Sequence, residues 1–290
     1  MKTFGAQNMT GILRRVLVKR PGPAMADADP DAWNYHGSLD LVRLQANFDD
    51  FVAVLKKSGG RVEFIDQDAD ELADACFTHD PSLVTDRGAV LLRMGKDLRQ
   101  GEVELHAEAY QTHDVPILGR IKAPGTVEGG DCLWLDERTL AVGCGYRTNE
   151  AGINQLRSIL APLNIEVLSY DLPVLAGPHA CLHLMSLISI VDVDLALVHS
   201  PLMPVRFYQA LGQRGVSLIE APADEFMASG AISVNVLATS PRHCVMAAGW
   251  TKTQAVLLDH GCTVDTFDGS ELCHKAEGGP TCLTRPILRD

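Results

Sequence analysis

Cys282 lies on a glycine- and proline-rich turn that suits a cysteine nucleophile. Cys282 belongs to EGGPTCLTRP, residues 277–286, where two glycines and a proline precede it. A cysteine inside a strand or helix behaves as a small hydrophobic side chain, whereas one on a turn is held by backbone and is accessible. A thiol without function near the end of the chain is the simpler alternative. The turn nevertheless makes Cys282 a candidate nucleophile.

Other titratable side chains precede apolar, strand-like runs elsewhere in the chain. They are Asp80 before PSLVTDRGAVLL, Glu128 and Asp131 around two glycines before CLWL, and His183 before LMSLISIV. Taken singly, each has a plainer explanation. The two acidic motifs are common turn sequences, and a histidine in an apolar run is more often a core residue. Their recurrence at one position of a repeat, described below, favours a shared site.

A thiol, an imidazole and two carboxylates together would suit attack on a cationic carbon. The thiolate attacks and the imidazole transfers protons, as in a protease or a transferase. Carboxylates contribute little to binding a neutral amide, but they hold a cation by charge-assisted hydrogen bonds. A guanidinium is a cation with a planar carbon open to attack. These residue types therefore predict thiol-dependent cleavage of a guanidine, with no metal and no cofactor.

The elements that would position these residues repeat about every fifty residues. Five segments with helical apolar spacing each lead into a short strand, and these strands begin near residues 61, 115, 165, 216 and 263. Hairpin-like stretches lie between them, and GILRRVLVKRPG supplies an early strand. Five α/β units without polar caps favour a closed ring over a solenoid. No Gly/Ser-rich linker divides residues 1–290, which predicts one domain whose loops converge on a central axis.

The composition is that of an ordinary globular chain and excludes several classes of function. The 290 residues are 46% hydrophobic and 21% charged, with a net charge of −12 and scattered Lys and Arg. Without a basic stripe, nucleic acid is not an expected partner. No apolar run of 18 residues predicts a membrane span, and the N-terminus lacks a signal-like core. Eight cysteines without a CxxC pair indicate reduced thiols and a cytoplasmic protein.

Four motifs together resemble one enzyme family. APGTVEGGD, YRTNEAG, LHLMS and GGPTC resemble the dimethylarginine dimethylaminohydrolases, relatives of the arginine deiminases and amidinotransferases. The resemblance extends from about Arg14 to Thr284. It implies a five-bladed α/β propeller, or pentein, of five ββαβ-type modules around a pseudo-five-fold axis. It also implies hydrolysis of arginine or an Nω-methylated arginine, with dimethylarginine the best single substrate, to citrulline and an amine through a covalent thiouronium.

The resemblance further implies which residues act in catalysis. Cys282 would be the nucleophile. His183 would protonate the leaving amine and then activate the hydrolytic water, and Glu128 would orient His183.

The resemblance also implies the residues that bind the small cationic guanidino substrate. Asp80 would bind the guanidinium nitrogens, and Asp74 would contact the amino-acid end. Arg99 in KDLRQGE and Arg147 in GYRTNE would bind the α-carboxylate, for which a forked cation is suited. Asp131 would support the Glu128 turn.

Two departures from the family pattern concern the substrate. His79 stands where the family usually has a glutamate before the guanidinium-binding aspartate, so it would weaken the hold on a cation. The segment PGPAMADADPDAWNYHGSLDL is longer than the usual lid, and its Trp33 and Tyr35 either cap the site or pack the loop. The alternatives are an arginine deiminase, a hydrolase of another guanidino compound, a less favoured amidinotransferase, and a non-catalytic binding ring. A homo-oligomer is left open.

Overall fold

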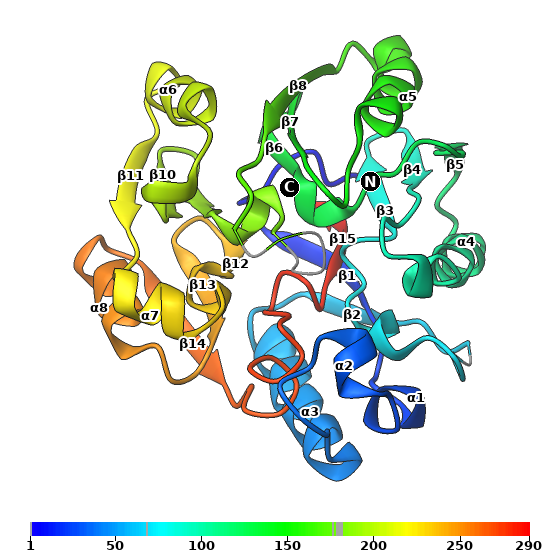
Figure 1. Cartoon of the computed structure of the whole chain (residues 1–290). Coiled ribbons are helices and arrows are strands. Elements are labelled where there is room, and N and C mark those ends of the chain that lie inside the picture. Colours follow the sequence, from blue (N-terminus) through cyan, green and yellow to red (C-terminus); the bar gives the residue numbers. More distant parts are fainter. Residues whose placement is uncertain (1, 68, 176, 178–181) are drawn as a thin grey trace.

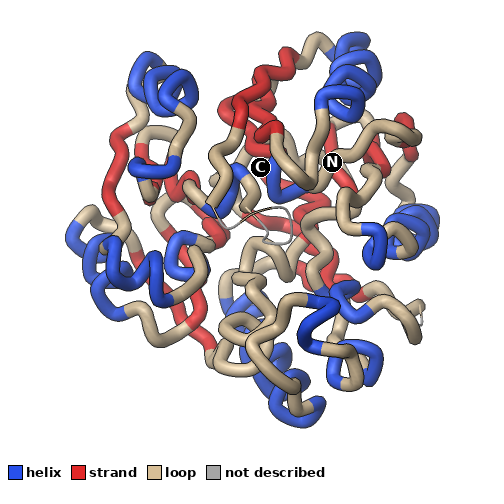
Figure 2. The backbone as a smooth tube through the Cα atoms, in the orientation of Figure 1, coloured by secondary structure: helices blue, strands red, loops and turns tan. Residues whose placement is uncertain are grey.

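Five small sheets surround a central axis like the blades of a propeller, with helices at the periphery (Figures 1 and 2). The computed structural model describes residues 2–67, 69–175, 177 and 182–290. Within these residues, each of the five sheets has three strands: an antiparallel pair and a third strand parallel to the middle one. The predicted five-bladed α/β propeller is therefore confirmed.

The first blade joins the two ends of the chain. Its strand order is β15-β1-β2, from β15 (Arg285–Arg289), β1 (Leu13–Val18) and β2 (Arg61–Phe64). β15 pairs with β1 antiparallel, so the last strand closes the ring against the first module, as expected for a ring.

The other four blades follow in chain order. They consist of β3 (Ser82–Thr85), β4 (Gly88–Leu91) and β5 (Ile117–Arg120); β6 (Cys132–Asp136), β7 (Thr139–Cys144) and β8 (Glu166–Asp171); β9 (Ile188–Asp192), β10 (Leu195–Val198) and β11 (Ser217–Glu220); and β12 (Leu237–Ser240), β13 (His243–Ala247) and β14 (Thr263–Phe267). In the blades where Figure 1 labels all three strands, the first lies nearest the axis and the third nearest the rim. The predicted fifty-residue period therefore corresponds to one blade.

A helix leads from the middle strand to the outer strand of every blade. These five helices of the described chain are α3 (Leu41–Lys57), α4 (Glu102–Thr112), α5 (Glu150–Leu160), α6 (Val205–Gln213) and α8 (Thr251–Asp259). Three shorter helices are α1 (Pro23–Ala26) and α2 (Pro30–Trp33) in the N-terminal segment, and α7 (Ala223–Ala228).

Helix α3 shows why these segments fold as the sequence predicts. The Asp40 side chain accepts a hydrogen bond from the Arg43 backbone N–H and caps the first turn. Leu44, Phe48, Phe51 and Leu55 follow at helical spacing, and all are buried. The apolar stripe therefore holds the helix against its blade, and the polar face is left to solvent.

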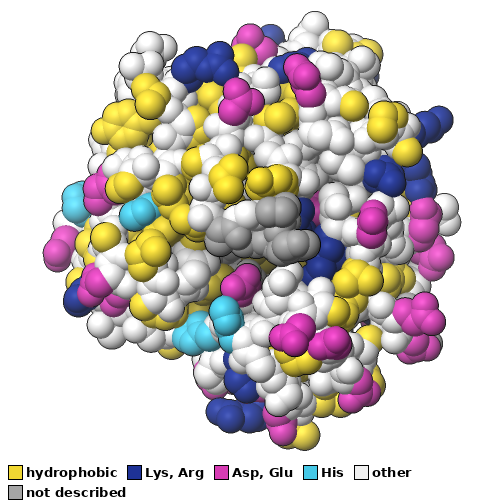
Figure 3. Space-filling model, viewed as in Figure 1, with side chains coloured by type: hydrophobic (Ala, Val, Ile, Leu, Met, Phe, Trp, Pro, Cys, Tyr) yellow, Lys and Arg dark blue, Asp and Glu magenta, His cyan; other side chains and the backbone are white. Residues whose placement is uncertain are grey.

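The core lies between neighbouring blades, in four clusters of buried apolar side chains. Packing between blades leaves the axis available for polar residues. Charged side chains are scattered around the face shown in Figure 3, without a basic stripe. No helix in the described part of the chain is long and apolar enough to cross a membrane. Seven cysteines are free thiols, and Cys181 lies outside the described residues. The single domain stays a prediction.

Candidate active site

The segments just before the innermost strands converge at the axis, and four of the residues predicted from the sequence lie on them. Asp80 precedes β3, Glu128 precedes β6, His183 precedes β9 and Cys282 precedes β15. A cavity of about 60 Å³ opens among them. Its walls are Trp33, Asn34, Asp74, Phe77, Asp80, Lys96, Arg99, Arg147, His183, Ala276, Glu277, Gly278 and Cys282. Glu128 lies directly behind this wall, fully buried.

The turn that carries Cys282 requires its two glycines. A Cβ on Gly278 would collide with the ring of Phe77, and one on Gly279 would lie 2.5 Å from Cγ of Asn235. No ordinary side chain fits at either position, because real Cβ atoms do not approach other atoms so closely. The glycines let the loop pack flat against its neighbours and bring the half-buried thiol to the cavity.

Asn235 holds the thiol from the remaining blade. Its Nδ2 donates to Sγ of Cys282 at 3.1 Å, while its Oδ1 accepts from the Thr281 backbone N–H at 2.9 Å. Burial, followed by the negative charge of Asp80, raises the pKa of Cys282 to about 11, although His183 and the Asn235 hydrogen bond oppose the rise. The thiol is therefore protonated at neutral pH.

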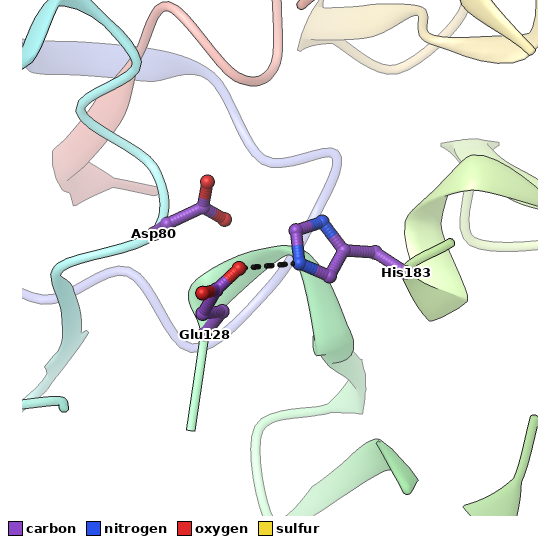
Figure 4. Close-up of side chains that lie close together, drawn as sticks. All are labelled: Asp80, Glu128 and His183. Atoms are coloured by element: carbon purple, nitrogen blue, oxygen red, sulfur yellow. Dashed lines mark hydrogen bonds and ion pairs between the residues drawn. The ribbon is translucent and has the colours of Figure 1, made fainter. Parts of the chain in front are cut away.

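Glu128 and His183 form a hydrogen-bonded pair. His183 Nε2 lies 2.8 Å from Glu128 Oε2, and Figure 4 shows the carboxylate facing the imidazole ring. Arg147 Nη1 donates to both carboxylate oxygens, at 3.2 and 3.1 Å. Burial alone would raise the pKa of Glu128, but the His183 hydrogen bond and the Arg147 charge outweigh it and lower this pKa to about 2. The carboxylate therefore stays ionised and stabilises a protonated imidazole.

Asp131 supports the histidine segment with its side chain. Its Oδ1 accepts a hydrogen bond from the Leu184 backbone N–H at 2.9 Å, directly after His183. Its backbone N–H donates to the Glu128 carbonyl at 3.1 Å. Asp131 is fully buried and is not among the residues that line the cavity.

Asp80 faces the cavity between two donors. Its Oδ1 accepts from the Gly130 backbone N–H at 2.8 Å, and its Oδ2 accepts from Arg99 Nη1 at 2.7 Å. Arg99 also makes two hydrogen bonds to Glu102, each of 2.9 Å. Burial opposes ionisation of Asp80, but the charges of Arg99 and His183 outweigh it and lower its pKa. Arg99 and Arg147 thus both reach the cavity, yet their guanidinium groups already bind carboxylates of the protein.

The N-terminal segment reaches the mouth of the same cavity. Lys96 Nζ lies 3.2 Å from Asp74 Oδ2, 3.0 Å from the Trp33 carbonyl oxygen and 4.4 Å from the centre of the Trp33 ring. Tyr35 donates from its hydroxyl to Asp74 Oδ1 at 2.7 Å. Trp33 therefore borders the cavity, and Tyr35 packs behind it and fixes Asp74.

Comparison with known proteins gives the family. The arginine deiminase family model matches residues 64–206. A relative from Streptomyces coelicolor, an N(G),N(G)-dimethylarginine dimethylaminohydrolase, is 30% identical over 271 residues, 93% of this chain and 96% of the relative. This chain belongs to the dimethylarginine dimethylaminohydrolase family.

Solved structures agree with the dimethylarginine dimethylaminohydrolase family in fold. The Pseudomonas aeruginosa enzyme, solved as a mutant with citrulline, has a TM-score of 0.78 at 23% identity and covers 96% of this chain and 100% of its own. An amidinotransferase of saxitoxin biosynthesis from Microseira wollei has a TM-score of 0.82 at 15% identity, covering 99% and 97%. At such identities the likeness concerns the propeller alone.

His79, the departure from the dimethylarginine dimethylaminohydrolase pattern, does not face this cavity. Its Nδ1 lies 2.9 Å from the Thr284 carbonyl oxygen, and the ring lines a second cavity on the axis. Burial, and then the charge of Arg285, lower its pKa to about 3, so the ring is neutral. The structure therefore places the His79 side chain outside the cavity that the other predicted residues line, and His79 contacts the Cys282 segment through its backbone N–H.

Two residues near the cavity, Asn235 and Lys96, were not predicted from the sequence. Asn235 precedes β12, at the position of the blade where the other modules carry Asp80, Glu128, His183 and Cys282. The phase of the repeat could have identified it, but an amide does not titrate. Lys96 has no comparable signal, because its approach to Asp74 depends on tertiary structure.

The acidic and imidazole side chains also have spacing suited to a cation. One ligand atom each from Asp80, Glu128 and His183 lie within 4.8 Å of one another. Arg99 and Arg147 already bind the two carboxylates, and His183 is hydrogen-bonded to Glu128. These contacts already use lone pairs that a metal ion would need. The absence of a metal stays a prediction.

Proposed function

We propose that this chain hydrolyses the guanidinium group of an Nω-methylated arginine, with dimethylarginine as the first choice, to citrulline and an amine. The observation that carries the proposal is the meeting of Cys282, His183 and Asp80 in one cavity, with Glu128 bonded to His183 behind it. The names of the Streptomyces coelicolor relative and of the citrulline-containing Pseudomonas aeruginosa structure support it. In this proposal residues 1–290 form one catalytic domain, which acts in the cytoplasm, where a thiol stays reduced.

The substrate is bound through its two charged ends. Asp80 accepts hydrogen bonds from the guanidinium nitrogens, which are directed toward the Cys282 and His183 end of the cavity. The ammonium group of Lys96 lies at the mouth, where it contacts Asp74 and the Trp33 carbonyl, and it attracts the α-carboxylate. Burial lowers the pKa of Lys96, and the negative charge of the bound carboxylate would raise it again. Arg147 adds a second positive charge. Asp74 accepts from the substrate's α-ammonium group.

Cleavage of the C–N bond begins at Cys282. The bound guanidinium brings a positive charge to the thiol and opposes the burial that raises its pKa, so the thiolate forms in the complex and the thiol proton is released to solvent. Sγ attacks the guanidinium carbon and forms a C–S bond. His183, kept protonated by Glu128, gives its proton to the dimethylated nitrogen. Dimethylamine leaves as the C–N bond breaks, and a thiouronium remains on Cys282.

Hydrolysis restores the enzyme with the same residues. Neutral His183 takes a proton from water, and the resulting hydroxide attacks the thiouronium carbon. The C–S bond then breaks, the electron pair returns to Sγ of Cys282, and the hydroxyl proton of the adduct is released as the ureido C=O of citrulline forms; the thiolate regains its proton from solvent. One water is consumed, and citrulline is released together with the amine.

Arginine deimination is the second candidate, favoured by the match of the arginine deiminase family model to residues 64–206. The chemistry is the same, but the leaving group is ammonia. The difference therefore lies in the space around the leaving nitrogen and not in the reacting residues.

A product assay tests the proposal. Purified protein and Cys282→Ser receive asymmetric dimethylarginine, monomethylarginine and arginine separately, and citrulline, methylamines and ammonia are quantified. Citrulline with an equal amount of dimethylamine, from the wild type only, is the expected result. Ammonia from arginine in excess of dimethylamine would select the deiminase. No turnover of any of the three compounds would favour a binding ring and overturn the proposal.

A further inference from the structure

A second cavity lies on the axis of the propeller, and two arginines of the last strand line it. Its volume is about 20 Å³, and Arg285 and Arg289 of β15 form part of its wall together with His79, Trp134 and Ile190. β15 lies near the centre of the ring (Figure 1). This cavity is distinct from the one that Cys282 and His183 line.

The two guanidinium groups are buried, and the acceptors that they contact are backbone carbonyls. Arg285 and Arg289 are each only 4% exposed. Arg285 Nη2 donates to the His79 carbonyl, and Arg289 donates to the carbonyls of Gly11 and Ala238 at 2.6 and 2.8 Å. Among the described residues, Nε of each arginine has no hydrogen-bond partner, and neither side chain forms an ion pair.

Such a pair of cations is unfavourable unless something neutralises it. Buried charges in proteins are paired or bind ions, since transfer of an isolated charge from water is costly. Burial lowers the pKa of both arginines, and the charge of Arg285 lowers that of Arg289 further, to about 9. A negative charge between them would reverse both effects.

We propose that this axial cavity binds one monatomic anion of halide size, chloride in the cell, held by the guanidinium groups of Arg285 and Arg289. The volume of the cavity exceeds the roughly 10–15 Å³ that a single water needs, which leaves room for one halide ion but not for phosphate or sulfate. A water molecule would satisfy the Nε donors, but it adds no negative charge to that of Asp80, which already favours the charged form of Arg285.

The site lies directly beneath the catalytic residues. Arg285 holds the carbonyl of His79, the residue before Asp80, while the His79 backbone N–H donates to the Cys282 carbonyl at 3.1 Å. An anion that fixes Arg285 therefore braces the loops that carry Asp80 and Cys282. Its role is structural and takes no part in the reaction, so the inference does not depend on the proposed function.

Crystals of the full chain grown in sodium bromide provide the direct test. Data collected at the bromine absorption edge are expected to show an anomalous peak within hydrogen-bonding distance of Nε of Arg285 and Arg289. In parallel, the thermal unfolding midpoint is measured in sodium chloride and in sodium gluconate at equal ionic strength. Chloride is expected to raise the midpoint by on the order of 2–4 °C more than gluconate.

Variants separate the site from general salt effects. Arg289→Met removes one guanidinium and should abolish both the bromide peak and the preference for chloride. Arg120→Met, an exposed arginine on β5, should retain both. If Arg289→Met does not fold, the bromide map of the wild type decides alone. A wild-type cavity without an anomalous peak, or a peak that survives in Arg289→Met, would overturn the proposal.

Discussion

The hydrogen bond from Asn235 to the thiol is expected to set how readily Cys282 ionises. Asn235→Asp is the sharpest perturbation, because it keeps the shape of the side chain and an oxygen for the Thr281 N–H, but replaces the Nδ2 donor with oxygen. The thiolate would then form beside an acceptor instead of a donor. The pKa of Cys282, which burial already raises to about 11, should rise further.

The size of the effect follows from the geometry of this contact. A hydrogen bond to a charged group contributes about 1.5–3 kcal/mol. The contact is 3.1 Å long, within the range of sulfur hydrogen bonds, and one pKa unit corresponds to about 1.4 kcal/mol. Loss of the donor should therefore raise the thiol pKa by about 1–2 units. At a fixed pH below that pKa, the thiolate population should fall roughly 10- to 100-fold.

Alkylation by iodoacetamide without substrate measures this directly, since the rate follows the thiolate of Cys282. The rate is recorded between pH 7 and pH 11 with peptide mapping of the modified cysteine. Asn154→Asp is the matched control, because Asn154 is exposed on α5. The reasoning is refuted if Asn235→Asp, folded as judged by circular dichroism, gives the wild-type pH profile. Asn235 would then only fix the backbone of Thr281.

Three further predictions concern the charged residues of the site. Lys96→Met should raise KM for an arginine substrate about 10-fold with little change in kcat, because the substrate carboxylate loses a charge-assisted contact of about 1.5 kcal/mol. Agmatine has no α-carboxylate, so an equal rise in KM for agmatine would contradict this. Glu128→Gln should lower kcat by about 10²–10⁴ in steady-state assays, since His183 loses its ionised partner, and an unchanged kcat would rule out that role. The pKa of Glu128 lies at about 2, below the ordinary 4.5, so its ionisation stabilises the fold above pH 4.5, and this is lost as the pH falls toward 2. The free energy of unfolding should fall by about 3 kcal/mol over this pH range. In urea unfolding, the free energy of Glu128→Gln should depend less on pH than that of the wild type. Equal pH dependence in the two proteins would disprove the prediction.

Local periodicity made the blades predictable. The helix of residues 41–57 has its apolar side chains at helical spacing after an aspartate cap, and the strand that follows begins at Arg61, where the pattern changes. These patterns depend only on residues close in sequence, so they can be recognised without knowledge of the fold. The ring itself followed from counting five equal units, and the pairing of β15 with β1 confirms it.

The contacts within the site were less predictable, because they depend on pairs distant in sequence. Arg99 could be identified as a site residue, but its partners Asp80 and Glu102 are fixed only when a short helical turn at residues 97–99 packs behind Asp80. His79 and Asp80 are adjacent, yet one side chain turns to the Thr284 carbonyl and the other to Arg99. In a turn, neighbouring side chains diverge, and composition cannot tell which faces the axis.

Closure of the ring and placement of the nucleophile are one structural event. Cys282 lies three residues before β15, and the partner strand β1 lies at the opposite end of the sequence. The loop ahead of it is fixed by close approach to Phe77 of the second module and Asn235 of the fifth. The thiol therefore reaches its position only when modules from the whole sequence have assembled. The same strand carries Arg285, which holds the carbonyl before Asp80, so closure aligns the nucleophile and the cation-binding carboxylate together. A cysteine on a Gly-Gly-Pro turn late in the chain is explained by this geometry, because the last strand is the one that completes the axis.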